Sequence, residues 1–191
     1  MEQAYIEEQT FDKVDFSEKP LARGDYEYCT FVHCNLTEVN LTDINFLECT
    51  FTDCNLSMAN LTNTAFRDVA FKDCKMLGLH FERCNTFGLS FRFEDCTLNY
   101  ASFYQLKLKK TSFRSVQLQE ADFTECDLTS AVFDNCDLIG AIFSNTILIK
   151  ASLRTSFNYS IDPETNRIKG AKFSWPAVAG LLHKYDIDIA M

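Results

Sequence analysis

Four of the nine cysteines are spaced in a way that could bring them together around a metal ion. Cys34, Cys54 and Cys74 are evenly spaced along the chain, and the step from Cys74 to Cys96 is two residues longer than the earlier steps. Thiolates are common zinc ligands, but a structural zinc site needs its four ligands at the corners of a tetrahedron. Cysteines stacked side by side in one column cannot take that arrangement. We therefore expect no metal site and predict that these thiols pack as small apolar side chains.

The other residue types that perform chemistry show no catalytic pattern. The sequence contains no GxGxxG, GxxxxGK[ST], HExxH or GxSxG motif, each of which marks a known kind of nucleotide-binding or catalytic site. His33, His80 and His183 are far apart in the chain. We therefore predict no catalytic residues, no cofactor and no enzymatic activity.

The charge balance narrows the choice of partner. The chain carries 27 acidic and 18 basic side chains, a formal net charge of -9. This excess disfavours direct contact with nucleic acid or an anionic membrane and favours a cationic protein surface. The start of the sequence lacks the basic and apolar regions of a signal peptide, and no apolar stretch could span a bilayer. We expect a cytoplasmic protein with reduced thiols.

A large apolar residue recurs at every fifth position, and this period decides the fold. One unbroken run extends from Phe11 to Phe81, and a second, displaced by two residues, from Phe93 to Leu153. A period of five fits neither an α-helix nor a flat strand, since either would scatter these side chains around its surface. The chain must therefore turn once per repeat. All nine cysteines keep the phase two residues before a repeat position, Cys84 doing so before Thr86, where the rhythm breaks. Small buried side chains are expected at this phase.

Two repeats show the sequence signature most clearly, residues 59–63 (ANLTN) and residues 121–125 (ADFTE). They resemble the A(D/N)LXX signature of the pentapeptide-repeat family. The resemblance implies an all-β fold, a right-handed quadrilateral β-helix in which four repeats form each square coil. We assign residues 1–173 to this solenoid and expect about eight coils with a filled interior that leaves no room for an active-site pocket.

Residues 82–92 interrupt the repeat with two extra residues. A bulge around Phe87 and Gly88 is the simplest explanation, because glycine tolerates the backbone angles that an extra residue demands. The interruption is either a structural kink between two halves or a protrusion that presents Phe87 and Leu89 to a partner.

A different pattern follows the last coil, in residues 174–191. Ser174 or Trp175 could cap a short α-helix with Pro176 in its first turn. Four apolar residues fall at helical spacing and form one stripe: Val178, Leu181, Leu182 and Tyr185. The helix either caps the last coil or, together with Trp175, forms the centre of a homodimer interface, which is the arrangement we expect.

The acidic side chains are concentrated in the first half of the chain. Residues 1–85 hold 15 acidic and 7 basic side chains, a net of -8, whereas residues 86–191 hold 12 and 11, a net of -1. The coil register predicts an acidic stripe in which Asp53, Asp73 and Asp95 stack along one face, and Glu48 stacks on Asp68 at the preceding corner. Lys72, Arg67 and Arg92 are expected close enough to neutralise part of it. Like charges one coil apart repel each other, so folding alone does not favour them. The stripe is either a solvated face or a surface that binds a partner.

The mid-chain break, the acidic surface and the C-terminal apolar segment together resemble the quinolone-resistance (Qnr) branch of the family. The resemblance implies a dimeric rod that imitates DNA, binds DNA gyrase or topoisomerase IV and protects it from fluoroquinolones. The predicted partner is thus a type II topoisomerase, contacted through the acidic stripe. The alternative is a scaffold or toxin-immunity protein that binds an unrelated protein.

Overall fold

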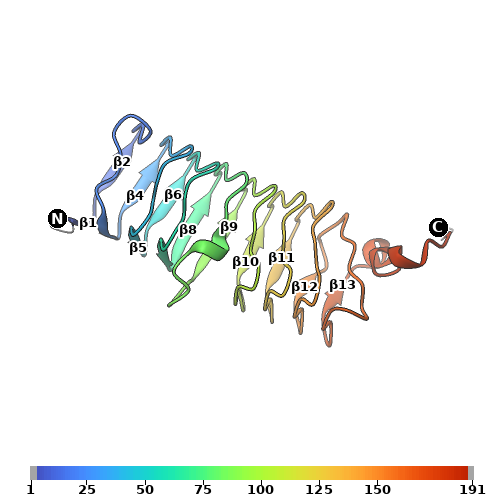
Figure 1. Ribbon diagram of the computed structural model, residues 1–191. Coiled ribbons are helices and arrows are strands. Elements are labelled where there is room, and N and C mark those ends of the chain that lie inside the picture. Colours follow the sequence, from blue (N-terminus) through green and yellow to red (C-terminus); the bar gives the residue numbers. More distant parts are fainter. Residues whose placement is uncertain (1–3, 189–191) are drawn as a thin grey trace.

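The chain turns at regular intervals because its backbone enters the left-handed region once per repeat. The computed structural model describes residues 4–188 and shows a rod of stacked coils (Figure 1). Consecutive corners lie at His33, Glu38 and Asp43, whose φ angles are 53°, 58° and 61°. Each corner comes two residues after an apolar centre. The period of five therefore alternates an inward side chain with a turn, and four such turns close one coil.

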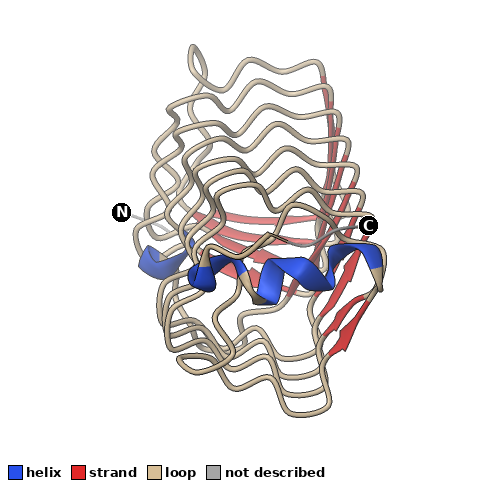
Figure 2. Ribbon diagram, turned by 90° about the vertical axis from the view of Figure 1, so that its right-hand side faces the viewer, coloured by secondary structure: helices blue, strands red, loops and turns tan. Residues whose placement is uncertain are grey.

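Parallel strands on two sides of the coil hold the stack together. The short sheet contains β1 (Ala4–Glu7), β3 (Gly24–Glu27), β5 (Asn45–Leu47) and β7 (Ala65–Arg67). The long sheet contains β2 (Thr10–Asp12), β4 (Thr30–Val32), β6 (Thr50–Thr52), β8 (Val69–Lys72), β9 (Phe91–Glu94), β10 (Ser112–Arg114), β11 (Val132–Asp134), β12 (Ser152–Leu153) and β13 (Lys172–Phe173). Isolated parallel bridges connect the coils elsewhere. Figure 2 shows the four-sided outline, and the predicted all-β quadrilateral solenoid is confirmed.

Phenylalanine rings fill the interior in continuous stacks. Phe31 lies 4.4 Å from Phe51, with the two rings only 6° from parallel. Rings on adjacent sides meet edge to face, as Phe123 and Phe133 do at 5.8 Å and 90°. Both geometries are favourable for aromatic quadrupoles. Aromatic contacts between successive coils therefore stabilise the stack in addition to the burial of apolar surface.

The cysteines occupy a buried column position where a small hydrogen-bond donor fits. Cys54 Sγ lies 3.4 Å from the carbonyl oxygen of Phe31, and Thr64 fills the equivalent position with its Oγ1 donating to Leu41 at 2.7 Å. All nine cysteines are free and buried. Burial raises the pKa of the Cys49 thiol to about 12 and that of Cys136 to about 11.

We expect these thiols to be unreactive in the folded protein, because alkylating reagents attack the exposed thiolate. Titration with iodoacetamide at neutral pH should label no cysteine stoichiometrically in the native state and all nine after denaturation. Rapid native labelling of Cys49 or Cys136 would contradict this assignment.

The two extra residues of the break lie between β8 and β9. Before the break, ladder partners such as Phe31 and Phe51 are separated by four repeats. Across it, the separation is two residues longer, as in Phe71 with Phe93. The 3-10 helix η1 (Phe81–Arg83) precedes a loop in which Gly88 has a φ of 69°. The length change is absorbed outside the ladder, so the long sheet continues through the break.

The C-terminal segment differs from the expected α-helix. It forms two 3-10 helices, η2 (Pro176–Leu181) and η3 (His183–Tyr185). Such a short segment is a marginal helix by itself, and the coil below fixes its geometry, since the Ile161 N–H donates to the Gly180 carbonyl at 3.0 Å. A 3-10 helix has three residues per turn, so the residues of the predicted apolar stripe no longer lie on one side of the segment. Leu181 packs against the core, whereas Leu182 is exposed.

One lysine ties this segment to the loop before β13. Lys184 Nζ lies 2.8 Å from Asp162 Oδ1 and 2.6 Å from Glu164 Oε2. Hydrogen bonds from Lys184 hold the pKa of both carboxyl groups below their usual range. Their contribution to stability is therefore present above the unfolded-state pKa of about 4 and is lost as the pH falls through the lower folded-state pKa.

We predict that acid loosens the cap before the rod. When the pH is lowered below about 4, the protection factor of the Ile161 amide should decrease. The protection factor of the Phe103 amide, in the middle of the rod, should stay the same. Lys184→Met should lower Ile161 protection at neutral pH in the same way. Hydrogen-exchange mass spectrometry measures both, and unchanged Ile161 protection in either case would show that the ion pairs do not hold the cap.

Within residues 4–188, none of the helices is both long and apolar enough to cross a membrane.

Candidate functional site

The five residues of the predicted acidic stripe lie on two different corners of the rod. Asp53, Asp73 and Asp95 follow the long sheet, and the N–H groups of Asp53 and Asp73 donate to the next coil at 3.0 Å. Glu48 and Asp68 precede the long sheet, at the corner that it shares with the short sheet. We call Asp53, Asp73 and Asp95 the aspartate ladder. The predicted stripe is therefore a ladder on one corner and a separate pair on the neighbouring corner.

Few basic side chains contact the aspartate ladder. Asp53 lies 3.8 Å from His33 Nε2, and that ring also contacts Asp12 at 3.1 Å. Asp73 and Asp95 form no ion pair with any residue between 4 and 188. The ladder thus presents consecutive carboxylates, one per coil, with little neutralisation.

Backbone geometry explains only part of this choice of residues. The φ angles of Asp53, Asp73 and Asp95 are 52°, 52° and 53°, in the left-handed region that Asp and Asn tolerate best. Asn135 occupies the same column with a φ of 54°. Asparagine therefore satisfies the backbone without the repulsion between stacked carboxylates. At these corners an amide thus meets the backbone requirement as well as a carboxylate does.

The surface beside the ladder is basic. A shallow groove of about 320 Å³ lies on the long sheet, where the short side chain of Ala70 leaves space between longer neighbours. Its lining includes three basic side chains, Lys72, Arg92 and Arg114, and one acidic side chain, Glu94, which lies 3.8 Å from Arg114. Arg92 lies 3.7 Å from Asp68, so the acidic pair on the other corner is partly neutralised. On the long sheet and its two corners, the anionic surface without basic partners is therefore the ladder itself.

The bulge presents one of its two predicted contact residues. Phe87 is 79% exposed, whereas Leu89 packs partly against the core. Arg67 holds the loop in place: its Nε donates to the Phe87 carbonyl at 3.3 Å, and its guanidinium lies 5.7 Å from the Phe87 ring centroid. Of the two residues, Phe87 alone is available as a contact.

The predicted dimer residues divide in the same way. Leu181 packs against the core and so helps to cap the last coil, and Val178 is half-buried. Trp175 is 88% exposed, and Leu182 and Tyr185 are also exposed. Dimerisation through this segment stays a prediction that now depends on the three exposed residues.

Sequence reasoning missed the acidic cluster on the short sheet. Tyr5 donates to Glu27 Oε2 at 3.1 Å, and this bond together with nearby carboxylates raises the pKa of Tyr5 to about 12. The charge of Glu48 raises the pKa of Tyr28. Glu7 and Glu27 are ladder partners, so extending the coil register to the first coil would have found the cluster.

A filled parallel solenoid that turns once every five residues defines a class of repeat proteins. The sequence matches two descriptions of one family: "Pentapeptide repeat region" over residues 25–92 and "Pentapeptide repeats (8 copies)" over residues 117–154. Together the matches cover more than half of the chain. The chain belongs to the pentapeptide-repeat family.

A solved structure shows the same fold. A trypsin-treated form of QnrB1, a plasmid-mediated fluoroquinolone resistance protein, is similar with a TM-score of 0.64 and 18% identity, over 97% of this chain and 91% of that chain. Full-length QnrB1 gives a TM-score of 0.43 and 20% identity over 95% and 99% of the two chains. HetL, a protein involved in heterocyst differentiation regulation from the cyanobacterium Nostoc sp. strain PCC 7120, gives 0.43 and 16% over 87% and 86%. No curated protein matches the chain.

Proposed function

We propose that this protein is a non-catalytic binding protein whose aspartate ladder occupies a basic DNA-binding surface on a type II topoisomerase, DNA gyrase or topoisomerase IV. The observation that carries the proposal is the run of three largely un-neutralised carboxylates at a corner where an amide would serve the backbone equally well. The Qnr-like features of the sequence supply the identity of the partner, and fluoroquinolone protection follows if the ladder displaces the DNA that the drug requires.

The charge spacing of the ladder suits a local imitation of DNA. Stacked coils place a carboxylate about every 4.8 Å along the rod, while one strand of B-DNA places a phosphate about every 3.4 Å along its axis. The ladder is therefore sparser than a phosphate backbone but has the same sign and a similar periodicity. Its basic neighbours on the long sheet limit the imitation to one edge.

A supercoiling assay tests the proposal. Purified protein is titrated into gyrase reactions with and without a fluoroquinolone, and into matched topoisomerase IV decatenation reactions. We expect micromolar protein to inhibit the reaction or to restore activity in the presence of the drug. If the protein has no effect on either enzyme, with or without the drug, the proposal is wrong.

A scaffold or immunity protein with an unrelated partner is the second candidate. The basic groove with Lys72, Arg92 and Arg114 favours it, because a surface that combines both signs of charge fits a protein partner better than it imitates DNA. Capture of one protein from lysate by the wild type but not by a Lys72→Glu, Arg92→Glu variant, without topoisomerase subunits, would support this candidate.

A further inference from the structure

The side of the rod that carries the short sheet begins with a strongly acidic surface. Its outward residues and those of the following corner include a single basic side chain, Arg67. The acidic half of this face consists of Glu7, Glu8, Asp25, Glu27, Glu48 and Asp68. Glu48 and Asp68 thus belong to this face rather than to the aspartate ladder.

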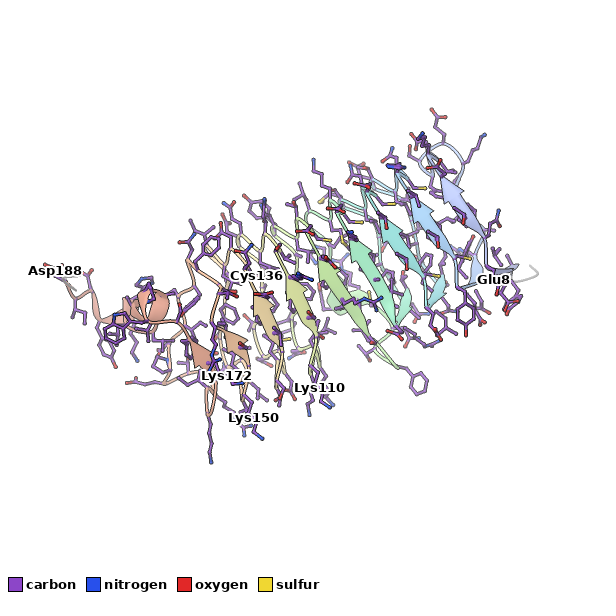
Figure 3. All side chains as sticks on the ribbon, turned by 180° about the vertical axis from the view of Figure 1, so that it is seen from behind. Glu8, Lys110, Cys136, Lys150, Lys172 and Asp188 are labelled. Atoms are coloured by element: carbon purple, nitrogen blue, oxygen red, sulfur yellow. The ribbon has the colours of Figure 1, made fainter. Side chains whose placement is uncertain are left out.

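The same side becomes basic beyond the break. Residues 70 and 92 are ladder partners, and Phe93 pairs with Phe113, which places Lys110 in the corner column of Asp68. The basic half consists of Lys107, Lys109, Lys110, Lys150, Arg167 and Lys169. It includes a single acidic residue, Asp127, which Lys109 contacts at 3.2 Å. Figure 3 shows Lys110 and Lys150 projecting from one edge of the rod, with Glu8 toward its N-terminal end.

The break lies midway between the two halves. Four coils precede it on this face, represented by Glu7, Glu27, Leu47 and Arg67. Four follow it, containing in turn Lys107, Asp127, Ile147 and Arg167. Between them lies the bulge with Phe87, which is 79% exposed. Along the rod, this face is therefore first acidic, then apolar at the bulge, and then basic. The acidic and basic halves each extend over four coils from the apolar centre.

We propose that a second copy of this chain packs antiparallel against this face, with a two-fold axis through the bulge, in place of a dimer contact through the C-terminal segment. Glu7 and Glu8 then lie opposite Arg167 and Lys169 of the other copy, and Phe87 packs against Phe87. Such an isologous contact closes on itself. A parallel arrangement would juxtapose like charges, so complementarity also fixes the orientation.

The contact uses a different corner from the aspartate ladder and is independent of the proposed function. The ladder stays accessible in the dimer, so one assembly presents two ladders. Because the long Glu, Lys and Arg side chains meet at an exposed surface, the association is sensitive to salt.

Sedimentation velocity on two charge-reversed variants tests the inference. One variant carries Glu8→Lys, Glu27→Lys and Asp68→Lys, and the other carries Lys107→Glu, Lys110→Glu and Lys169→Glu. Corner positions accept both residue types, since Lys110 and Glu120 have φ angles of 61° and 53°. We expect each variant alone to be monomeric and an equimolar mixture to form a heterodimer. The wild-type dissociation constant should rise at least about tenfold between about 50 and 500 mM NaCl, as charges become screened.

Reversals on a corner that does not border this face, Glu38→Lys and Glu120→Lys, should leave the dimer intact. Dimer formation in the equimolar mixture would itself show that both charge-reversed variants are folded. The inference is overturned if the mixture stays monomeric. It is also overturned if Trp175→Ala with Leu182→Asp abolishes the dimer while the reversed variants retain it. Duplex DNA binding by the basic half of a protein that remains monomeric at low salt would assign that half to nucleic acid instead.

Discussion

Replacing Phe113 by alanine should lower the free energy of unfolding by about 3–5 kcal/mol, the range for removing a buried aromatic side chain. Phe113 is fully buried and stacks on Phe93 at 5.4 Å and on Phe133 at 4.7 Å. It also meets Phe103 and Phe123 edge to face. The solenoid interior is narrow and filled at each level, so the cavity cannot collapse without disturbing the coils above and below.

The measurement is urea unfolding followed by circular dichroism. In a repeat protein, stability is a sum of units and of the interfaces between neighbours, so Phe113→Ala should also broaden the transition by uncoupling the two ends. Phe113→Leu is the matched control, because Leu153 occupies the same column, and it should cost less than half as much. Phe87→Ala, at the surface, should leave the midpoint unchanged. A loss of less than about 1 kcal/mol in Phe113→Ala would contradict the stacked core.

Converting the aspartate ladder to amides should weaken partner binding about a hundredfold without weakening the fold. The triple variant Asp53→Asn, Asp73→Asn, Asp95→Asn keeps side chains suited to the left-handed corner and removes three stacked charges. Each charge pair with a basic surface is worth up to about 1 kcal/mol when exposed, and three together give the expected loss. Removing the repulsion between coils should leave thermal stability equal or slightly higher.

Binding is measured by interferometry against gyrase or topoisomerase IV at fixed salt. The matched control is Asp43→Asn, Glu120→Gln, Glu125→Gln, which removes three charges from corners with φ angles of 61°, 53° and 56°. Equal losses in both variants would indicate a general effect of net charge, and the ladder would then have no special role. A wild-type-like affinity in the ladder variant would remove the ladder from the interface.

The fold followed from the sequence because its cause is local and repeated. A centre such as Phe31 followed two residues later by a left-handed corner such as His33 occurs once per repeat, so the signal adds up over the whole chain. The C-terminal segment has no such repetition. Whether Pro176 to Leu181 form an α-helix or a 3-10 helix depends on the carbonyl of Gly180 and the coil beneath it, which the spacing of apolar residues does not encode.

The surfaces were only half predictable. The coil register correctly stacked Asp53 on Asp73 and predicted that Asp95 continues the column across the break. It also stacked Glu48 on Asp68 at the preceding corner and predicted that Arg92 lies close enough to neutralise part of the stripe. It did not identify Asp68 as the carboxylate that Arg92 approaches. Nor did it show that the acidic and basic halves of one face are equidistant from Phe87. Those relations depend on the path of the break and on which corner each column follows.

The sequence by itself determined the coil: a period of five, an apolar centre and a polar corner leave the backbone one way to bury its side chains while bonding its amides to the next coil. The tertiary structure alone decided which charges are neighbours. Residues one coil apart are stacked by the repeat, but residues in different columns, such as Asp68 and Arg92, come together only through the path of the break and the reach of their side chains. The positions of ion pairs, grooves and complementary faces are therefore properties of the folded rod.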